Sequence, residues 1–192
     1  MTEDFGNRWH NRRSIRLRGF DYSGAGHYFV TVCTWNRECL FGCIRDGRMG
    51  LNDGGQTVEK CWRQIPAHFP HAESDEFVVM SNHVHGIIVI AHTVGTKNFS
   101  PLPCGGEATP VPFRSPEKNL GSIVRGFKIG VTKWFRSHTE VYSVWQRNYF
   151  DHAVRDLADL ERIRRYIRAN PGHWIDDPEN SVNAGHPMED RS

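Results

Sequence analysis

Two apolar runs separated by only two residues constrain the fold of this chain more than any other feature. The runs Glu76–Met80 and His83–Ala91 are rich in β-branched side chains and are joined by Ser81-Asn82. Segments of this length and composition are typical of β-strands. Because both runs are almost continuously apolar, we expect them to occupy a central position in a sheet that is covered on both faces.

The remainder of the chain supplies further strands and helices around these two runs. Strands are predicted over 27–35 and 144–154, and a short hairpin over 44–51 with Asp46-Gly47 as its turn. Apolar spacing predicts helices over 58–68, 120–135 and 156–170. In the last of these, Asp156 is a plausible N-cap, Pro171 ends the helix, and the buried stripe is formed by Leu157, Leu160, Ile163 and Ile167. This order favours an α+β fold, with helices packed on an antiparallel or mixed sheet.

The length and composition of the chain indicate a single globular domain with less ordered additions. Its 192 residues suit one domain over 27–174, preceded by a basic arm at 1–26. Residues 93–116 carry five prolines and are expected to form a flexible loop, and the polar tail at 175–192 is expected to be disordered. Five cysteines without a CxxC pair argue against a zinc ribbon, and no apolar stretch suggests a membrane span. A reduced cytoplasmic setting is therefore expected.

Basic residues are concentrated in two stretches, although the formal net charge is only +2. No acidic residue interrupts either stretch, which suggests a surface that binds a polyanion such as DNA. Solvated surface charge is the competing interpretation. The residues considered as DNA contacts are Arg12, Arg13, Arg16 and Arg18 in the arm, Arg125, Lys128 and Lys133 in the helix, and Arg147.

The residues with the clearest chemical meaning are two histidines and a tyrosine. His83 and His85 stand two apart on a predicted strand, so both imidazoles lie on one face and could bind one divalent cation. A pair of hydrogen-bonded sheet histidines is the alternative, and the acid and third histidine of a HxHxDH hydrolase site are absent. Tyr166 and Asn170 lie four apart on the last predicted helix, where an amide oxygen would suit Mg²⁺ or Mn²⁺. A tyrosine that merely anchors the helix remains the alternative for Tyr166.

Four segments together resemble the REP-associated tyrosine transposases, which belong to the HUH single-tyrosine, TnpA-like transposases. These segments are VVMSNHVHGIIVI (78–90), LGSIVRGFK (120–128), VWQRNYFDHAVRD (144–156) and ERIRRYIRANP (161–171). The segment RRSIRLRGFDYSGAGHYFVTVCTWNRECLFG (12–42) also resembles the N-terminal segment of these proteins, so the resemblance covers about residues 10–174. Its most specific part is HxH on a strand followed by YxxxNP on a late helix. This chain departs from the family at Ser81, where a proline usually precedes Asn-His.

The resemblance implies a fold, a site and a substrate. The fold would be a ferredoxin-like antiparallel sheet with helices on one side. His83, His85 and Asn170 would bind the divalent metal, and Tyr166 would be the nucleophile that forms a 5′-phosphotyrosine intermediate. The substrate would be single-stranded DNA with a hairpin, such as a REP-like palindrome and its adjacent guide sequence. Relatives include monomers and homodimers.

Two other functions compete with this interpretation. HUH replication initiators and relaxases usually have longer chains, for which 192 residues leave no room. A domesticated hairpin-binding protein without catalytic activity is the second alternative, and the intact set of Tyr166, His83, His85 and Asn170 argues against it.

Overall fold

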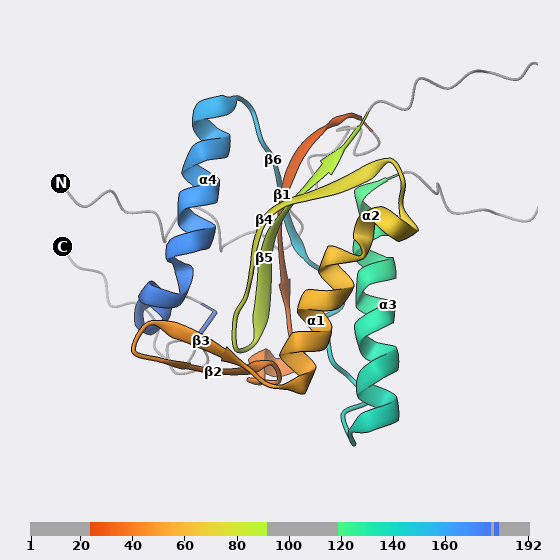
Figure 1. Ribbon diagram of the computed structural model, residues 1–192, viewed down its shortest axis with the longest axis vertical. Helices are drawn as coiled ribbons and strands as arrows, with labels where there is room; N and C mark the ends of the chain where they lie inside the picture. Colours follow the sequence, from red (N-terminus) through yellow and green to blue (C-terminus); the bar gives the residue numbers. More distant parts are fainter. Residues whose placement is uncertain (1–23, 92–118, 178, 181–192) are drawn as a thin grey trace, which may run out of the picture.

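The protein is built around a four-stranded antiparallel sheet (Figure 1). The computed structural model describes residues 24–91, 119–177 and 179–180. The strands follow the order β4-β5-β1-β6 and are β1 (Gly26–Cys33), β4 (Ala72–Val79), β5 (His83–Ile90) and β6 (Phe150–Ala153). The central position expected for both apolar runs is therefore correct for β5 and wrong for β4, which lies at the edge of the sheet.

The connections between the strands contain the helices. Between β1 and β4 the chain forms a 3-10 turn η1 (Trp35–Arg37), the hairpin β2 (Gly42–Arg45) and β3 (Arg48–Leu51), then α1 (Asp53–Arg63) and α2 (Ile65–His68). The long helix α3 (Leu120–His138) precedes β6, which is followed by α4 (Leu157–Ala169) and the 3-10 helix η2 (Asn170–Asp176). The order strand, helix, strand, strand, helix, strand, in this antiparallel arrangement, confirms the α+β ferredoxin-like sheet.

The two faces of the sheet are covered by different helices (Figure 1). One core cluster joins Val84 and Ile88 of β5 to α1 and α3. A second cluster joins Ile87 to Leu160, Ile163 and Ile167 of α4. The resemblance implied that the helices lie on one side of the sheet. This is correct for α1 and α3, whereas α4 covers the opposite face. Because strand side chains alternate, residues 83, 85 and 87 of β5 point toward the side of α4.

Several sequence predictions about element bounds and burial require correction. The helix expected over 58–68 begins at Asp53, because the Asn52 side chain accepts a hydrogen bond from Gly55 N and caps it, and it ends at Arg63. The strand expected over 144–154 is reduced to β6, although Trp145 forms a single bridge with Thr34. Leu157 is 79% exposed rather than buried, because it is the first residue of α4 and lies beyond the sheet contact.

The expected disorder of the tail is wrong for the residues just after Trp174. Residues up to Asp176 belong to η2, and Asp177, Glu179 and Asn180 are buried. This segment folds back because its polar groups find partners at the end of the sheet. Most of the basic arm (1–23), the loop 93–116 and residues 181–192 lie outside the described residues. Within the described residues, no helix is both long and apolar enough to cross a membrane.

Gly86 is a position where the fold depends on the absence of a side chain. A Cβ atom at Gly86 would lie 2.2 Å from Cζ2 of the buried Trp62. Gly86→Ala should therefore lower the free energy of unfolding by about 1–3 kcal/mol through overpacking, as measured by denaturant titration. At Gly130, on the exposed side of α3, a Cβ would meet only an ordinary contact at 3.5 Å. Gly130→Ala should stabilise the helix by up to about 1 kcal/mol, and equal effects at both sites would contradict this account.

Candidate metal centre

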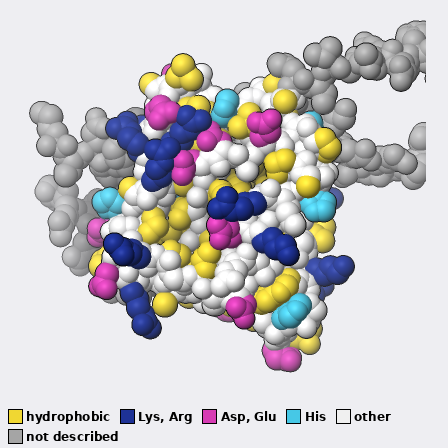
Figure 2. Space-filling view, viewed as in Figure 1, with side chains coloured by type: hydrophobic (Ala, Val, Ile, Leu, Met, Phe, Trp, Pro, Cys, Tyr) yellow, Lys and Arg dark blue, Asp and Glu magenta, His cyan; other side chains and the backbone are white. Residues whose placement is uncertain are grey.

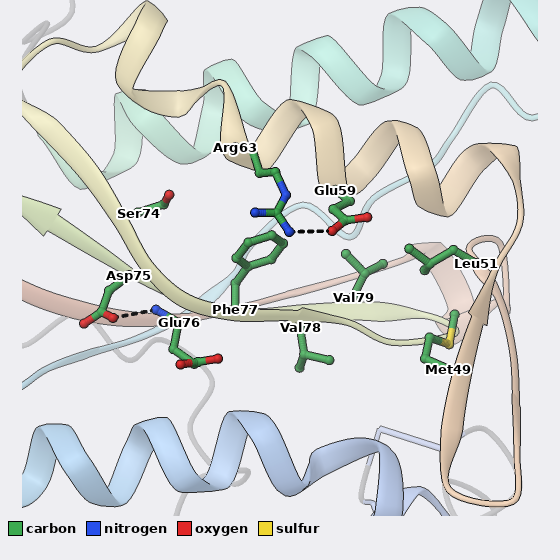
Figure 3. Close-up of a pocket in the computed structure, with 10 residues that line it drawn as sticks. All are labelled: Met49, Leu51, Glu59, Arg63, Ser74, Asp75, Glu76, Phe77, Val78 and Val79. Atoms are coloured by element: carbon green, nitrogen blue, oxygen red, sulfur yellow. Dashed lines mark hydrogen bonds and ion pairs between the residues drawn. The ribbon is translucent and has the colours of Figure 1, made fainter.

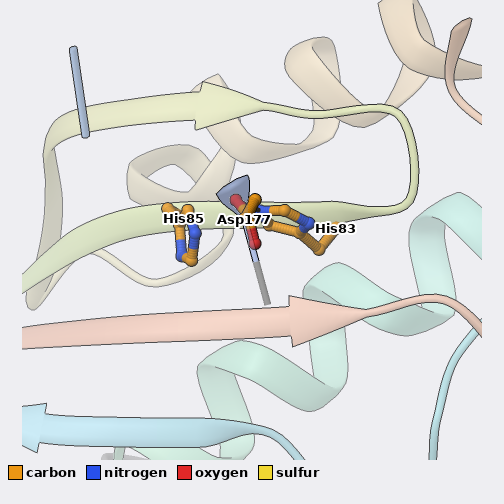
Figure 4. Close-up of side chains that lie close together, drawn as sticks. All are labelled: His83, His85 and Asp177. Carbon is orange, nitrogen blue, oxygen red and sulfur yellow. Dashed lines mark ion pairs between the residues drawn. The ribbon is translucent and has the colours of Figure 1, made fainter. Parts of the chain in front are cut away.

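The two predicted histidine ligands lie side by side within the protein. His83 and His85 are almost completely buried, with exposed fractions of 0% and 1%, and their ring centroids are 4.4 Å apart. Both project from β5 toward the face of the sheet covered by α4, as period-2 alternation predicted. Figure 4 shows the two imidazoles on this strand with Asp177 beside them.

Each imidazole has its Nδ1 atom engaged by a neighbouring side chain. His83 Nδ1 lies 2.8 Å from Asn82 Oδ1, and His85 Nδ1 lies 2.8 Å from Thr31 Oγ1. Histidines that bind metals typically use one ring nitrogen for the ion and the other for such a hydrogen bond. The arrangement therefore directs the Nε2 atoms of both rings toward the same small region.

A buried carboxylate completes this region. Asp177 Oδ2 lies 3.8 Å from His83 Nε2, and one ligand atom each of His83, His85 and Asp177 lies within 4.8 Å of the others. Asp177 is held by its own turn, in which its Oδ1 accepts a hydrogen bond from Glu179 N at 2.7 Å. These three residues form a group that could hold a metal ion. Sequence reasoning missed Asp177, because it stands in the segment assigned to the tail and no motif spacing relates it to the histidines.

Asn170 adds a further oxygen at the end of α4. Its side chain is buried, and within the described residues its Oδ1 atom has no hydrogen-bond partner. A buried acceptor without a donor is unfavourable unless a cation or water satisfies it. The two imidazole nitrogens and the carboxylate of Asp177 form a set that suits a divalent cation, so the residues present fit such an ion. Asn170 contacts Tyr166 beside this set, and its amide oxygen is of a ligand type that the same ion accepts.

Tyr166 brings its hydroxyl group to the same place. The hydroxyl lies 3.3 Å from His85 Nε2, and the ring packs edge-on against Phe29 and His85. Burial raises the pKa of Tyr166 well above its usual value, and the charge of Asp177 raises this pKa further. A hydrogen bond from the Asn170 side chain lowers the pKa of Tyr166, but by less than burial raises it. The structure thus brings Tyr166, both histidines and Asn170 together, and it adds Asp177.

Comparison with known proteins identifies one close relative. An uncharacterized protein of Haemophilus influenzae is 46% identical over 177 residues, which cover 92% of this chain and 97% of the relative. The chain belongs to the same family as that protein. No established family model matches the chain.

Comparison with solved structures finds the fold of this chain in another protein. The structure of a REP-associated tyrosine transposase bound to a REP hairpin aligns with a TM-score of 0.53. It is 19% identical, and the alignment covers 80% of this chain and 70% of that one. The resemblance to the REP-associated tyrosine transposases is thereby confirmed at the level of the fold. A candidate transposase from Deinococcus radiodurans aligns with a TM-score of 0.43 at 14% identity, covering 80% of this chain and 95% of that one.

Among the described residues, the predicted DNA contacts are not gathered at the metal centre. Arg12, Arg13, Arg16 and Arg18 lie outside the described residues. Arg125 and Lys133 are exposed on α3, which covers the other face of the sheet, and Arg147 is exposed in the segment before β6. Lys128 donates hydrogen bonds to the carbonyl oxygens of Gln146 and Asn148, and burial lowers its pKa to about 8. Its ammonium group thus holds this segment in place.

The helix that carries Tyr166 has its own arginines. Figure 2 shows Lys and Arg side chains gathered over α4 together with acidic side chains. Arg164 forms an ion pair with Asp75 at 2.6 Å, and Arg168 forms one with Glu76 at 2.8 Å. Both ion pairs connect α4 to β4. Arg165 is exposed and forms no ion pair with any described residue. It is therefore the arginine of α4 most available to a ligand.

A separate cavity of about 520 Å³ lies along the edge strand β4 (Figure 3). Its lining comes from β4, α1 and β3, and includes Phe77, Met49 and the ion pair of Glu59 with Arg63. Its described lining does not include His83, His85, Asp177 or Tyr166. This cavity is therefore distinct from the candidate metal centre.

Proposed function

We propose that this protein is a metal-dependent tyrosine transposase that nicks and rejoins single-stranded, hairpin-forming DNA. One observation carries the proposal. The hydroxyl group of Tyr166 lies 3.3 Å from Nε2 of His85, which belongs to a buried group of potential metal ligands from β5 and from the segment just after η2. A phenol in this position combines a potential nucleophile with potential ligands for an activating ion.

The proposed reaction proceeds in two displacements at phosphorus. The hydroxyl oxygen of Tyr166 attacks the backbone phosphorus, its proton passes to water, and a phosphotyrosine bond to the 5′ side forms as the bond to the 3′ oxygen breaks. The departing 3′ oxygen takes up a proton and becomes a hydroxyl group. A second 3′ hydroxyl then attacks the phosphotyrosine, which releases Tyr166 and joins the new strand. Because one phosphodiester is exchanged for another, the process needs no external energy source.

His83, His85, Asp177 and Asn170 would hold the divalent ion, Mg²⁺ or Mn²⁺. A bound ion supplies charge stabilisation for the phosphoryl oxygens, which is typically worth several kcal/mol. The protein itself orients the nucleophile, because the ring of Tyr166 packs against Phe29 and His85. The ring is half-buried, which would limit the access of water to a phosphotyrosine at this position.

The proposed substrate follows from the structural relative, which was solved with a REP hairpin. We propose that this chain also binds a hairpin with an adjacent single strand. The single strand would reach Tyr166 near the exposed Arg165, whereas the exposed residues of α3 would contact phosphates farther from the site.

Salt dependence can test these contacts. Log affinity falls as log salt concentration rises. Arg165→Ala should weaken hairpin binding and make this fall less steep by about 0.7–0.9 in slope, which is the contribution of one phosphate contact. The double variant Arg125→Ala/Lys133→Ala should reduce the slope by about twice that amount if α3 touches the stem. Arg48→Ala, on the exposed hairpin β2–β3, serves as the control and should leave the slope unchanged. If the slope is unchanged in Arg165→Ala and in the double variant, as it should be in the control, the proposed phosphate contacts of α4 and α3 are wrong.

The decisive experiment is to trap the protein on DNA. A labelled single-stranded oligonucleotide with a hairpin is incubated with the protein and Mg²⁺ or Mn²⁺, and denaturing electrophoresis then reveals any covalent adduct. Peptide mapping should place the adduct on Tyr166. Hairpin binding without nicking or adduct in either metal would instead favour a non-catalytic hairpin-binding protein.

A further inference from the structure

Asn82 occupies a junction of three segments at the metal centre. Its side chain is fully buried. The amide nitrogen donates to the carbonyl oxygens of Arg37 at 3.1 Å and of Glu179 at 2.7 Å. The amide oxygen lies 2.8 Å from Nδ1 of His83. One side chain therefore connects the turn after β1, the start of β5 and the segment that carries Asp177.

The two carbonyl oxygens determine which way the amide faces. A carbonyl oxygen only accepts hydrogen bonds, so the atom of Asn82 that faces Arg37 and Glu179 must be the NH₂ group. The reverse orientation would place the amide oxygen against two other oxygens without a hydrogen atom between them. The orientation thus follows from the chemistry of the surroundings, and Oδ1 must face His83.

This orientation in turn determines the protonation of one imidazole nitrogen. Oδ1 of Asn82 can only accept, so Nδ1 of His83 must carry the hydrogen atom that completes their 2.8 Å contact. In the neutral ring the lone pair is then on Nε2, the atom 3.8 Å from the Asp177 carboxylate. The partner of His85 differs, because the hydroxyl of Thr31 can donate or accept and is compatible with both tautomers.

We infer that Asn82 is a positioning residue that locks His83 in the Nδ1–H tautomer and so prepares Nε2 to bind the metal. The part of this inference that concerns metal binding rests on the proposed function. The tautomer of His83 does not, because it is a property of the folded chain without metal. The same amide also binds the carbonyl oxygen of Glu179, so it links the preparation of His83 to the position of the chain that follows Asp177.

The wild-type protein without metal provides the first test. A two-bond ¹⁵N–¹H correlation spectrum of the imidazoles distinguishes the protonated ring nitrogen from the unprotonated one. His83 should appear as the Nδ1–H tautomer before any metal is added. An Nε2–H tautomer, or rapid exchange between the two, would overturn the inference. This readout does not depend on DNA cleavage, so a protein with the expected tautomer but no nicking activity would contradict only the proposed function.

Two variants separate the accepting and donating roles of Asn82. Asn82→Ala removes both and should release the tautomer of His83 and weaken Mn²⁺ binding, measured by calorimetric titration, about 10- to 100-fold. Asn82→Asp retains an acceptor for Nδ1 but loses both donated hydrogen bonds. It should keep the Nδ1–H tautomer and bind Mn²⁺ more tightly than Asn82→Ala.

A third variant tests whether loosening the C-terminal segment alone explains the effect. Glu179→Gln weakens the ion pair with Arg37, which has a 3.1 Å separation, but keeps the carbonyl group that Asn82 contacts. It should leave the tautomer of His83 unchanged. Equal losses of Mn²⁺ affinity in Asn82→Ala and Asn82→Asp, with an unchanged tautomer in both, would show a purely structural role. If Asn82→Ala does not fold, the wild-type spectrum and Asn82→Asp still decide the question.

Discussion

Replacing Tyr166 with phenylalanine should abolish nicking and adduct formation while hairpin binding is retained. The substitution removes only the hydroxyl group that lies 3.3 Å from His85 Nε2, and the ring contacts with Phe29 and His85 can persist. Loss of a catalytic nucleophile can reduce turnover by on the order of 10⁶-fold. The measurement is the single-turnover rate on a labelled hairpin oligonucleotide, together with binding by gel shift.

A matched control is available on the surface. Tyr142 is 64% exposed in the segment after α3 and is not one of the residues of the metal centre, so Tyr142→Phe should cleave at the wild-type rate. Normal nicking by Tyr166→Phe would exclude this residue as the nucleophile. Loss of both binding and nicking would instead indicate that the hydroxyl group is needed for the fold of the site.

His83→Ala should eliminate metal binding and cleavage together. It removes one of the two nitrogens that face Asp177, so the remaining donors form an incomplete set around the ion. Wild-type protein should gain about 2.7 kcal/mol of stability when Mn²⁺ is present at 100 times its dissociation constant. The variant should gain almost none at the same concentration, as measured by denaturant titration with and without the ion.

His138→Ala provides the comparison for a general effect of losing an imidazole. His138 is exposed at the end of α3 and stacks on Trp134, far along the chain from β5. Its removal should leave both Mn²⁺ stabilisation and nicking intact. An active His83→Ala enzyme in the presence of a chelator would refute the metal-dependent mechanism.

The parts of the site that could be predicted are those governed by local periodicity. His83 and His85 share a face because strand side chains alternate, and Tyr166 and Asn170 share a face because helical residues four apart are neighbours. The hairpin at Asp46-Gly47 was also predictable, since both residues adopt positive φ angles of 51° and 68° that favour such a pair.

The parts that could not be predicted depend on how distant segments pack. Asp177 becomes a candidate ligand only because the chain after η2 folds back, and nothing in its neighbourhood of the sequence indicates this contact. Lys128 looked like a DNA contact, yet its ammonium group is used by two carbonyl oxygens of a later segment. The edge position of β4 likewise follows from sheet order, which its apolar composition does not specify.

The alternation along β5 has a consequence for how this gene can change over time. Val84 and Ile88 fill the core beneath α1 and α3, and the imidazoles of residues 83 and 85 face the other way. Inserting or deleting one residue in this strand would move the side chains beyond that point to the opposite face of the sheet. A side chain such as that of His85 or its neighbour would then replace Gly86 against Trp62, where even a Cβ atom would lie 2.2 Å from the indole ring. Substitutions can therefore accumulate here, but changes of length would destroy folding and chemistry in one event.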